Sequence, residues 1–518
     1  MHETGAAAFG AIHARSRLWA VVGPLVALVA VWTAGPRLWD DAYITLRYAR
    51  SLAEGKGFVF NPGEYVLGTT TPLFTLLLAG LHWLTGVGLE RWAFVLAAAG
   101  HVLSVALLAQ AACRVGLAAV GGLASVLYAT SPLTLSPALG GMESPLFVAV
   151  SLGALMPSKG PSWPLGIGMA SAVAGLLRPE GVLVAVAAGL LALRHGRAAV
   201  YRFLVVVVLA SLPWVIFASW YFGSPIPQSM AAKWASVREH PSPWSAVEYF
   251  LYALLALPLW AGPPVHGLWG RQVFGLQIAA NIPLGWTLEW RHVLALGAGG
   301  LVVMLVVVGW FRLLRRAPDT VGLLAFSFLY VLAYAIADPA MFAWYVLPPL
   351  PVATLGLFVG AWESLCTVVP GERWRRWLGV LAASFILLGS LYGVRVVSKP
   401  PALSREQAYR QAIELIGPPA QQEDTVIGAL EIGAVGYFSR ARVVDYYGLV
   451  SPTFRGPRVA TMIGRFRPDF FVFHEGLARW EGLLEDPVFQ QSYSRVGIID
   501  ASVGYVRAQI EVWRRCDR

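Results

Sequence analysis

Long apolar runs alternate with short polar segments over about the first 395 positions of this 518-residue chain. A helix that crosses a bilayer needs about 20 apolar residues. Runs of this length predict membrane helices near 91–113, 203–222, 292–314, 321–338, 345–365 and 375–395. The first run, "LWAVVGPLVALVAVWTAG", is longer than the apolar part of a signal peptide, and no A-x-A site ends it, so it predicts an uncleaved first helix. The pattern indicates a polytopic α-helical membrane protein.

Shorter apolar runs lie at 72–87, 117–135, 143–156, 163–177 and 179–194. Together with 91–113 they make six segments. We expect the loop before residue 72 to be external and the basic loop that begins at Arg194 to be cytoplasmic, but six crossings would return the chain to the external side. One segment must therefore fail to span. The runs at 72–87 and 143–156 are the best candidates for a re-entrant or interfacial position, because about 15 residues cover only about 22 Å of helix. We expect about 11 transmembrane helices.

Basic residues gather in three short loops at 194–202, 311–318 and 371–377, which the positive-inside pattern places in the cytoplasm. Arg15 and Arg17 precede the first apolar run, so the N-terminus is predicted to be cytoplasmic as well. This topology makes the loops at about 39–71 and 223–291 external, the second with a hairpin or interfacial helix near 245–261.

The composition changes near residue 398. Short β-branched or aromatic runs such as "DTVIGAL" and "RPDFFVFHEG" alternate with helical pieces such as "SREQAYRQAIELIG". We predict a transmembrane domain at 1–397 and a small extracytoplasmic α/β domain at 398–518. The glycines of the second domain do not form G-x-G-x-x-G, which argues against a dinucleotide site.

Composition agrees with the membrane assignment: 57% of the residues are hydrophobic and 13% are charged. The net charge of +10 does not indicate nucleic-acid binding, because the basic residues lie in the loops between apolar runs. The three cysteines are far apart and match neither metal nor redox spacing.

The stretch "LWDDAYITLRYAR" at 38–50 follows the first apolar run directly and contains an acidic pair. If it is helical, Asp40, Tyr43 and Arg47 share one face, with Asp40 and Arg47 about 10 Å apart along the axis. A base at one end and a cation at the other would suit a phosphate-linked sugar. In the alternative interpretation, the aspartates form a solvated interfacial N-cap and Arg47 and Arg50 reach towards lipid headgroups.

Other polar residues fall on the same external side, and an ionisable group near a bilayer indicates function by default. They are Lys56, Thr69, Thr70, Thr71, Glu143, Arg178, Glu180, Gln228, Lys233 and Asp338, with the aromatic pair Trp344 and Tyr345. Each also has a structural explanation, such as a helix cap, an interfacial lysine or an aromatic belt. Their convergence on one side is the stronger observation.

These residues resemble a known family. The stretch from 40 to 79, together with "GGMESPLF", "LLRPEG", "PIPQSMAAK", "WYVLPPLP" and "GALEIGAVGYFSRARVVDYYGLVSP", is similar to the GT-C superfamily of polyprenyl-phosphate-sugar glycosyltransferases. Within it, the chain looks most like the actinobacterial cell-wall arabinofuranosyltransferases that use decaprenyl-phosphate arabinose. The resemblance implies a GT-C fold in the bacterial cytoplasmic (inner) membrane. At Glu431 the chain departs from relatives that have a shorter acidic residue there.

The resemblance implies an inverting transfer of a sugar, with arabinofuranose favoured, from a polyprenyl-phosphate donor to the hydroxyl of an extracytoplasmic glycan or of another acceptor. Asp40 or Asp41 would be the general base, with Asp40 the first choice. The donor phosphate would be bound by Arg47, Arg178 and Lys233. The substrate contacts would come from Tyr43, Glu143, Gln228, Trp344 and Tyr345.

The resemblance leaves open a divalent cation, Mg²⁺ or Mn²⁺, at Asp40 or Asp41. The expected partners are the lipid-linked donor, the glycan acceptor and membrane lipids, with no nucleic acid. A transporter or flippase of a lipid-linked intermediate is the alternative, although such proteins usually show internal repeats and midplane charges.

Overall fold

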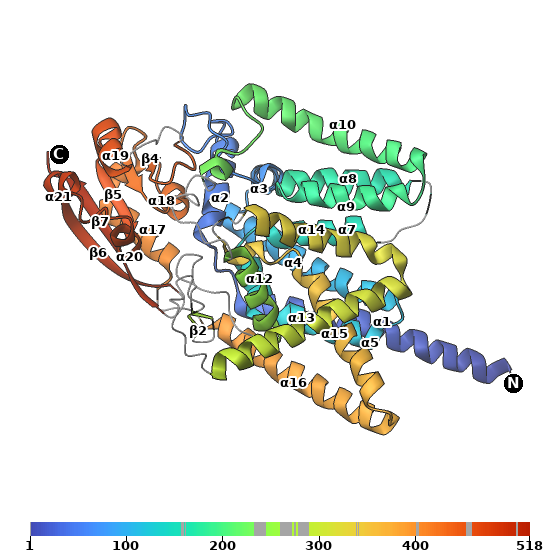
Figure 1. The fold of residues 1–518 in the computed structure, drawn as a ribbon. Helices are drawn as coiled ribbons and strands as arrows, with labels where there is room; N and C mark the ends of the chain where they lie inside the picture. Colours follow the sequence, from blue (N-terminus) through green and yellow to red (C-terminus); the bar gives the residue numbers. More distant parts are fainter. Residues whose placement is uncertain are drawn as a thin grey trace.

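The computed structural model describes residues 2–156, 160, 162–232, 245–259, 272–273, 276–277, 290–337, 339, 341–399, 403–451, 458–503 and 506–517. The N-terminal part is a helix bundle, and a small sheet domain lies at one end of it, away from the N-terminus (Figure 1). The helices up to the middle of the chain are α1 (His2–Ala34), α2 (Asp40–Ala53), α3 (Pro72–Thr85), α4 (Leu89–Arg114), α5 (Ala118–Thr130), α6 (Pro132–Leu139), α7 (Ser144–Leu155), α8 (Trp163–Leu177), α9 (Gly181–Leu193) and α10 (Arg197–Tyr221). They are followed by α12 (Ser245–Ala256), α13 (Trp290–Arg316), α14 (Val321–Ala337), α15 (Leu350–Val368) and α16 (Glu372–Ser398).

The lengths of these helices bear on the predicted spans. In the described part of the chain, six helices are long and apolar enough to cross a membrane, or seven if one bent pair counts as a span. Another six apolar helices have 10 to 17 residues. The chain is a multi-pass membrane protein, and the predicted helices near 203–222, 292–314 and 375–395 correspond to α10, α13 and α16. The expected number of about 11 spans stays a prediction, because it depends on whether the short helices cross the membrane.

The run at 117–135 does not form the single helix that the sequence predicts. It divides into α5 and α6, which meet at an angle of 54°. Pro132 begins α6, and a proline inside a helix removes a backbone donor and clashes with the preceding turn. Apolar length alone could not show this break. Helices α3 and α7 are as short as expected, at 14 and 12 residues.

The three basic loops lie at the bundle end that is far from the sheet domain. Helix α16 leads into that domain, so its arginine-rich beginning lies at the other end. Helix α10 ends beside the loop after α2, where the ring centroids of Tyr221 and Tyr65 are 4.9 Å apart. The basic beginning of α10 therefore also lies far from the sheet domain. Arg194 pairs with Asp319 at 3.7 Å and joins two of the loops. Their cytoplasmic location stays a prediction.

The C-terminal domain is a mixed five-stranded sheet in the order β4-β3-β5-β7-β6. Its elements are α17 (Arg405–Ile416), β3 (Val426–Ala429), α18 (Gly433–Phe438), β4 (Arg442–Asp445), α19 (Arg458–Phe466), β5 (Phe470–His474), α20 (Glu475–Trp480), α21 (Pro487–Ser492), β6 (Tyr493–Val503) and β7 (Val506–Arg515). Strands β4, β3 and β5 are parallel, and β7 and β6 are antiparallel to their neighbours. Ser404 and Gln407 form a capping box that starts α17. Helix α18 lies between the sheet and α2 (Figure 1).

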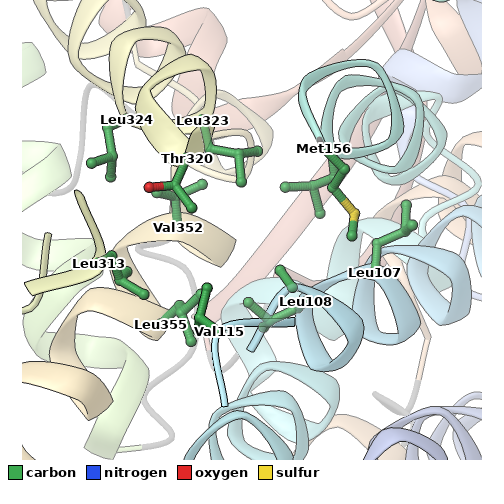
Figure 2. Close-up of a pocket in the computed structure, with 12 residues that line it drawn as sticks. Leu107, Leu108, Val115, Met156, Leu313, Thr320, Leu323, Leu324, Val352 and Leu355 are labelled. Carbon is green, nitrogen blue, oxygen red and sulfur yellow. The ribbon is translucent and has the colours of Figure 1, made fainter. Parts of the chain in front are cut away.

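An apolar pocket lies inside the bundle between α4, α7, α13, α14 and α15 (Figure 2). Its lining is aliphatic except for Met156 and Thr320. Met156 directly follows α7, whereas Glu143 directly precedes it. A helix of this length is about 18 Å long, so the pocket is separate from the polar groups at the other end of α7.

Candidate functional site

The backbone around Trp39 determines where α2 begins. Trp39 has an extended conformation, and its N–H donates to the carbonyl of Gly140 at 3.1 Å. A Cβ on Gly140 would lie 2.8 Å from the Trp39 ring, so this close approach requires glycine. The contact brings the acidic pair next to the segment that leads to Glu143. Asp40 and Asp41 then occupy the first turn of α2, where negative charge is favourable.

Asp40 is buried against α18 of the C-terminal domain. Its Oδ1 accepts the N–H of Ala434 at 2.7 Å, and its Oδ2 accepts the N–H of Gly433 at 3.1 Å. Burial raises the pKa of Asp40 to about 7, and the neighbouring Glu431 carboxylate adds to the increase. The side chain is only 5% exposed. Asp40 is therefore not the solvated interfacial cap that the alternative interpretation of the sequence describes.

Asp41 has a different environment although it is the next residue. It is half-buried, and successive side chains on a helix point about 100° apart, so it does not share the face of Asp40. Asp41 is the more accessible member of the acidic pair.

Arg47 binds backbone carbonyls. It donates to Phe60, Gly436, Ser439 and Ala441 at 2.9, 2.7, 2.5 and 3.2 Å, and it is 2% exposed. These contacts use four of its five N–H groups. Burial lowers its pKa to about 9, so it stays charged at neutral pH. Arg47 does not reach a lipid surface, and a phosphate would have to displace carbonyls to bind it.

Arg178 lies between two carboxylates at the ends of α7 and α9. It donates to Glu143 at 2.7 Å, to Glu180 at 2.8 Å and to the Ser144 hydroxyl at 2.6 Å. Tyr334 also donates to Glu180. We call Glu143, Arg178 and Glu180 the acidic cluster, because it contains two acidic side chains and one basic side chain. The structure thus brings together residues that lie 35 positions apart in the sequence.

Aromatic rings connect the acidic cluster to the beginning of α2. The Trp39 and Trp344 ring centroids are 5.5 Å apart, and the Arg178 guanidinium lies 5.5 Å from the centroid of the Tyr345 ring. Trp344 and Tyr345 contact each other edge to face. Both are buried, so they are not an exposed aromatic belt. Two of the predicted substrate residues therefore lie between the acidic pair and the acidic cluster.

The remaining predicted residues hold segments together. Tyr43 donates to Glu90 of α4 at 2.8 Å, and its ring packs on Tyr437 and Phe438. The Gln228 N–H donates to the carbonyl of Leu67 at 2.7 Å, and its side chain donates to the carbonyl of Gly448 at 3.3 Å. Lys233 and Asp338 lie outside the described residues.

Two further groups of residues support the site: from the sequence, Glu431 stood out only as a departure from relatives, and Asp445 did not stand out. Glu431 accepts hydrogen bonds from Arg405 at 2.5 Å and from Tyr409 at 2.6 Å. The charges of Glu431 and Arg405 face Asp40. Asp445, at the end of β4, accepts the N–H groups of Tyr447 at 2.8 Å and Val450 at 3.0 Å and so shapes the loop that reaches Gly68. The role of Glu431 depends on segments that lie far apart in the sequence, whereas the turn at Asp445 is local.

Asp40 does not fit the role of a metal ligand. Its two oxygens face N–H groups, which carry partial positive charge and repel a cation. Among the residues that the structure describes, no group of three or more His, Cys, Asp or Glu side chains could hold a metal ion.

Solved structures share this architecture of a helix bundle with a domain at one end. ArnT from Cupriavidus metallidurans in the apo state aligns with a TM-score of 0.52, at 12% identity over 97% of this chain and 98% of that chain. The oligosaccharyltransferase AglB from Archaeoglobus fulgidus, in complex with an inhibitory peptide and a dolichol-phosphate, aligns with a TM-score of 0.53, at 13% identity over 95% and 74%. The chain has the GT-C fold.

Two sequence matches accompany the GT-C fold. A curated terminal β-(1→2)-arabinofuranosyltransferase of Mycobacterium tuberculosis is 32% identical over 243 residues. This match covers 42% of the chain and 38% of the relative, so the chain spans well under half of the relative that it matches. Residues 401–513, in the C-terminal domain, match a family described as a domain of unknown function, DUF8728.

Proposed function

We propose that this chain is an inverting membrane glycosyltransferase that moves a sugar from a polyprenyl-phosphate donor to a hydroxyl of an extracytoplasmic glycan. The observation that carries the proposal is the acidic pair at the beginning of α2, which lies where the C-terminal domain meets an apolar bundle. A lipid-linked donor needs this combination, because its chain requires an apolar environment and its head group requires polar residues. The arabinofuranosyltransferase relative favours arabinofuranose as the sugar.

We assign the general base to Asp41. A base must reach the acceptor hydroxyl, and Asp41 is half-buried whereas Asp40 directs both oxygens to the backbone of α18. Asp41 takes the proton as the hydroxyl oxygen attacks the anomeric carbon. The bond from that carbon to the phosphate oxygen breaks, and the polyprenyl phosphate leaves with the electron pair. This assignment replaces Asp40, the first choice from the sequence.

The departing phosphate needs a cation, and we retain Lys233 and Arg178 for that role. Arg178 is paired with two carboxylates, so phosphate binding there would require one of them to move away or to be protonated. Arg47 is not assigned to the phosphate, because carbonyls occupy its N–H groups. The substrate residues we retain are Trp344 and Tyr345.

In this proposal the protein lies in the bacterial cytoplasmic membrane with the basic loops inside and the C-terminal domain outside. Membrane lipids surround the bundle, and the glycan acceptor approaches from the side of the C-terminal domain. The alternative function, transport or flipping of a lipid-linked intermediate, has less support, because the acidic pair and the acidic cluster lie near one end of the bundle.

The test is sugar transfer by the purified full-length chain in nanodiscs, with radiolabelled decaprenyl-phosphate arabinofuranose and a synthetic arabinan oligosaccharide. Asp41→Asn should reduce the rate by at least about 10²-fold and leave donor binding unchanged, because only proton transfer is lost. Asp319→Asn is the matched control, since Asp319 is 55% exposed and pairs with Arg194 at the far end of the bundle.

Full activity of Asp41→Asn would remove the base assignment. If the wild-type chain transfers no sugar from pentose or hexose donors but moves a fluorescent polyprenyl phosphate across proteoliposomes, the transporter alternative replaces the enzyme.

A further inference from the structure

One face of α2 is occupied by the C-terminal domain. Asp40, Tyr43, Arg47 and Arg50 lie at positions i, i+3, i+7 and i+10, which share a helix face. Each of them contacts α18 or the residues that follow it. The polar stripe of "LWDDAYITLRYAR" is therefore an intramolecular docking surface for a segment almost 400 residues away.

The N-terminal end of α18 is bound by a carboxylate. The first N–H groups of a helix have no partner inside the helix, and Asp40 accepts two of them, from Gly433 and Ala434. A Cβ on Gly433 would lie 1.8 Å from the Asp40 carbonyl oxygen and 2.9 Å from its carboxyl carbon. Only glycine permits the two backbones to approach this closely.

The C-terminal end of α18 is bound by two guanidinium groups. Arg47 donates to the carbonyls of Gly436 and Ser439, and Arg50 donates to Ser439 at 2.8 Å and to Tyr437. These carbonyls have no partner within the short helix, and cations there complement the helix dipole. Asp40 and Arg47 are about 10 Å apart along α2, which matches the length of about 9 Å for the six residues of α18.

The loop after α2 extends the same contact. The Asn61 side chain both donates to the carbonyl of Val443, at 2.9 Å, and accepts its N–H, at 3.0 Å. It thus pairs with the edge strand β4 as a neighbouring strand would. Glu64 pairs with Arg442 of the same strand at 2.5 Å. The C-terminal domain is held by α2 and by the loop that follows it.

We infer that this clamp, made by Asp40, Arg47 and Arg50 on the backbone of 433–441, positions Asp41 for the reaction, so that Asp40, Arg47, Arg50 and Gly433 are positioning residues. The inference rests on the proposed function, because it gives Asp41 the role of base. Asp41 follows Asp40 directly, so the docking of Asp40 on α18 orients the turn that carries Asp41. The C-terminal domain is thereby a required part of the active site.

The test compares Gly433→Ala with Gly464→Ala in the full-length chain. Gly464 lies in α19 of the same domain, and no atom lies within 4 Å of its added Cβ. Docking is measured by hydrogen exchange of the amides of Gly433 and Ala434, and activity by the decaprenyl-phosphate arabinofuranose assay. Gly433→Ala should accelerate the exchange and lower kcat by about 10- to 100-fold while the KM for the donor stays unchanged. Gly464→Ala should change neither.

A second pair of variants covers the case in which Gly433→Ala does not fold. Arg50→Gln loses the contacts to Ser439 and Tyr437, whereas Arg50→Lys retains a charge and can bind one carbonyl. We expect a lower kcat for Arg50→Gln and partial recovery for Arg50→Lys. Normal kcat despite fast exchange of the Gly433 and Ala434 amides would overturn the inference, as would slow exchange with a lost kcat. If Asp41→Asn is fully active while Gly433→Ala still accelerates the exchange of the Gly433 and Ala434 amides, the base assignment fails. The clamp then remains as a purely structural contact.

Discussion

Replacement of Arg178 by glutamine should be strongly destabilising. The Arg178, Glu143 and Glu180 side chains are 5%, 7% and 15% exposed, and the guanidinium lies within 2.8 Å of both carboxylates. Removal of one member of a buried ion pair costs about 3–5 kcal/mol, because the charge that remains has no compensation. Arg178→Gln leaves two such carboxylates, so we expect a loss near the upper end of that range.

The cause can be isolated with a triple variant. Arg178→Gln combined with Glu143→Gln and Glu180→Gln leaves no uncompensated charge, so it should recover more than half of the lost stability. Denaturant unfolding of the purified chain in detergent, followed by tryptophan fluorescence, measures both changes. Arg376→Gln is the control, since it breaks an exposed pair with Glu372 and should cost at most about 0.5 kcal/mol.

Two results would contradict a role for Arg178 in compensating these charges. A loss below about 1 kcal/mol for Arg178→Gln would show that the buried charges do not depend on it. A triple variant no more stable than the single variant would show that lost packing, and not unpaired charge, is the cause. Donor affinity separately tests whether Arg178 binds the donor phosphate. If it does, the triple variant regains stability without regaining donor affinity.

Three further predictions concern the C-terminal domain and its contact with α2. The pKa of Asp40 is about 7 in the folded chain and 3.8 ordinarily, so the folded state holds more protons between these values. Stability should therefore fall as pH rises from about 4 to 7, by up to about 1.4 kcal/mol per unit, and Asp40→Asn should flatten this part of a pH series of unfolding midpoints. Asp445→Ala leaves two N–H groups without their acceptor and should cost about 2–4 kcal/mol, with faster amide exchange at Tyr447 and Val450. Phe489→Ala removes a fully buried ring and should cost the domain about 3–5 kcal/mol in thermal unfolding, whereas unchanged stability would contradict its place in the core.

Sequence patterns predicted those parts of the fold that depend on local properties. The apolar runs located α10, α13 and α16, since membrane insertion depends on the hydrophobicity of a single segment. The 3.6-residue period placed Asp40, Tyr43 and Arg47 on one face of α2. The division of one apolar run into α5 and α6 was missed, because the pattern measures hydrophobicity and not the bend at Pro132.

The candidate site was predictable only as a set of polar residues on one side of the bundle. Glu143 and Arg178 were predicted to lie on the same side, and the structure joins them. The role of Arg47 could not be predicted, because its partners are carbonyls almost 400 residues later, and a backbone carbonyl has no signature in the sequence.

The membrane bundle, the C-terminal α/β domain and the acidic pair of "LWDDAYITLRYAR" can be predicted from local patterns, because hydrophobicity and helical periodicity act over a few turns. Contacts between distant segments are needed to show that Asp40 docks on α18 while Asp41 remains half-buried. Two adjacent aspartates are equivalent in a sequence. They differ in the fold because a helix directs neighbouring side chains about 100° apart, and the C-terminal domain covers only one of those directions.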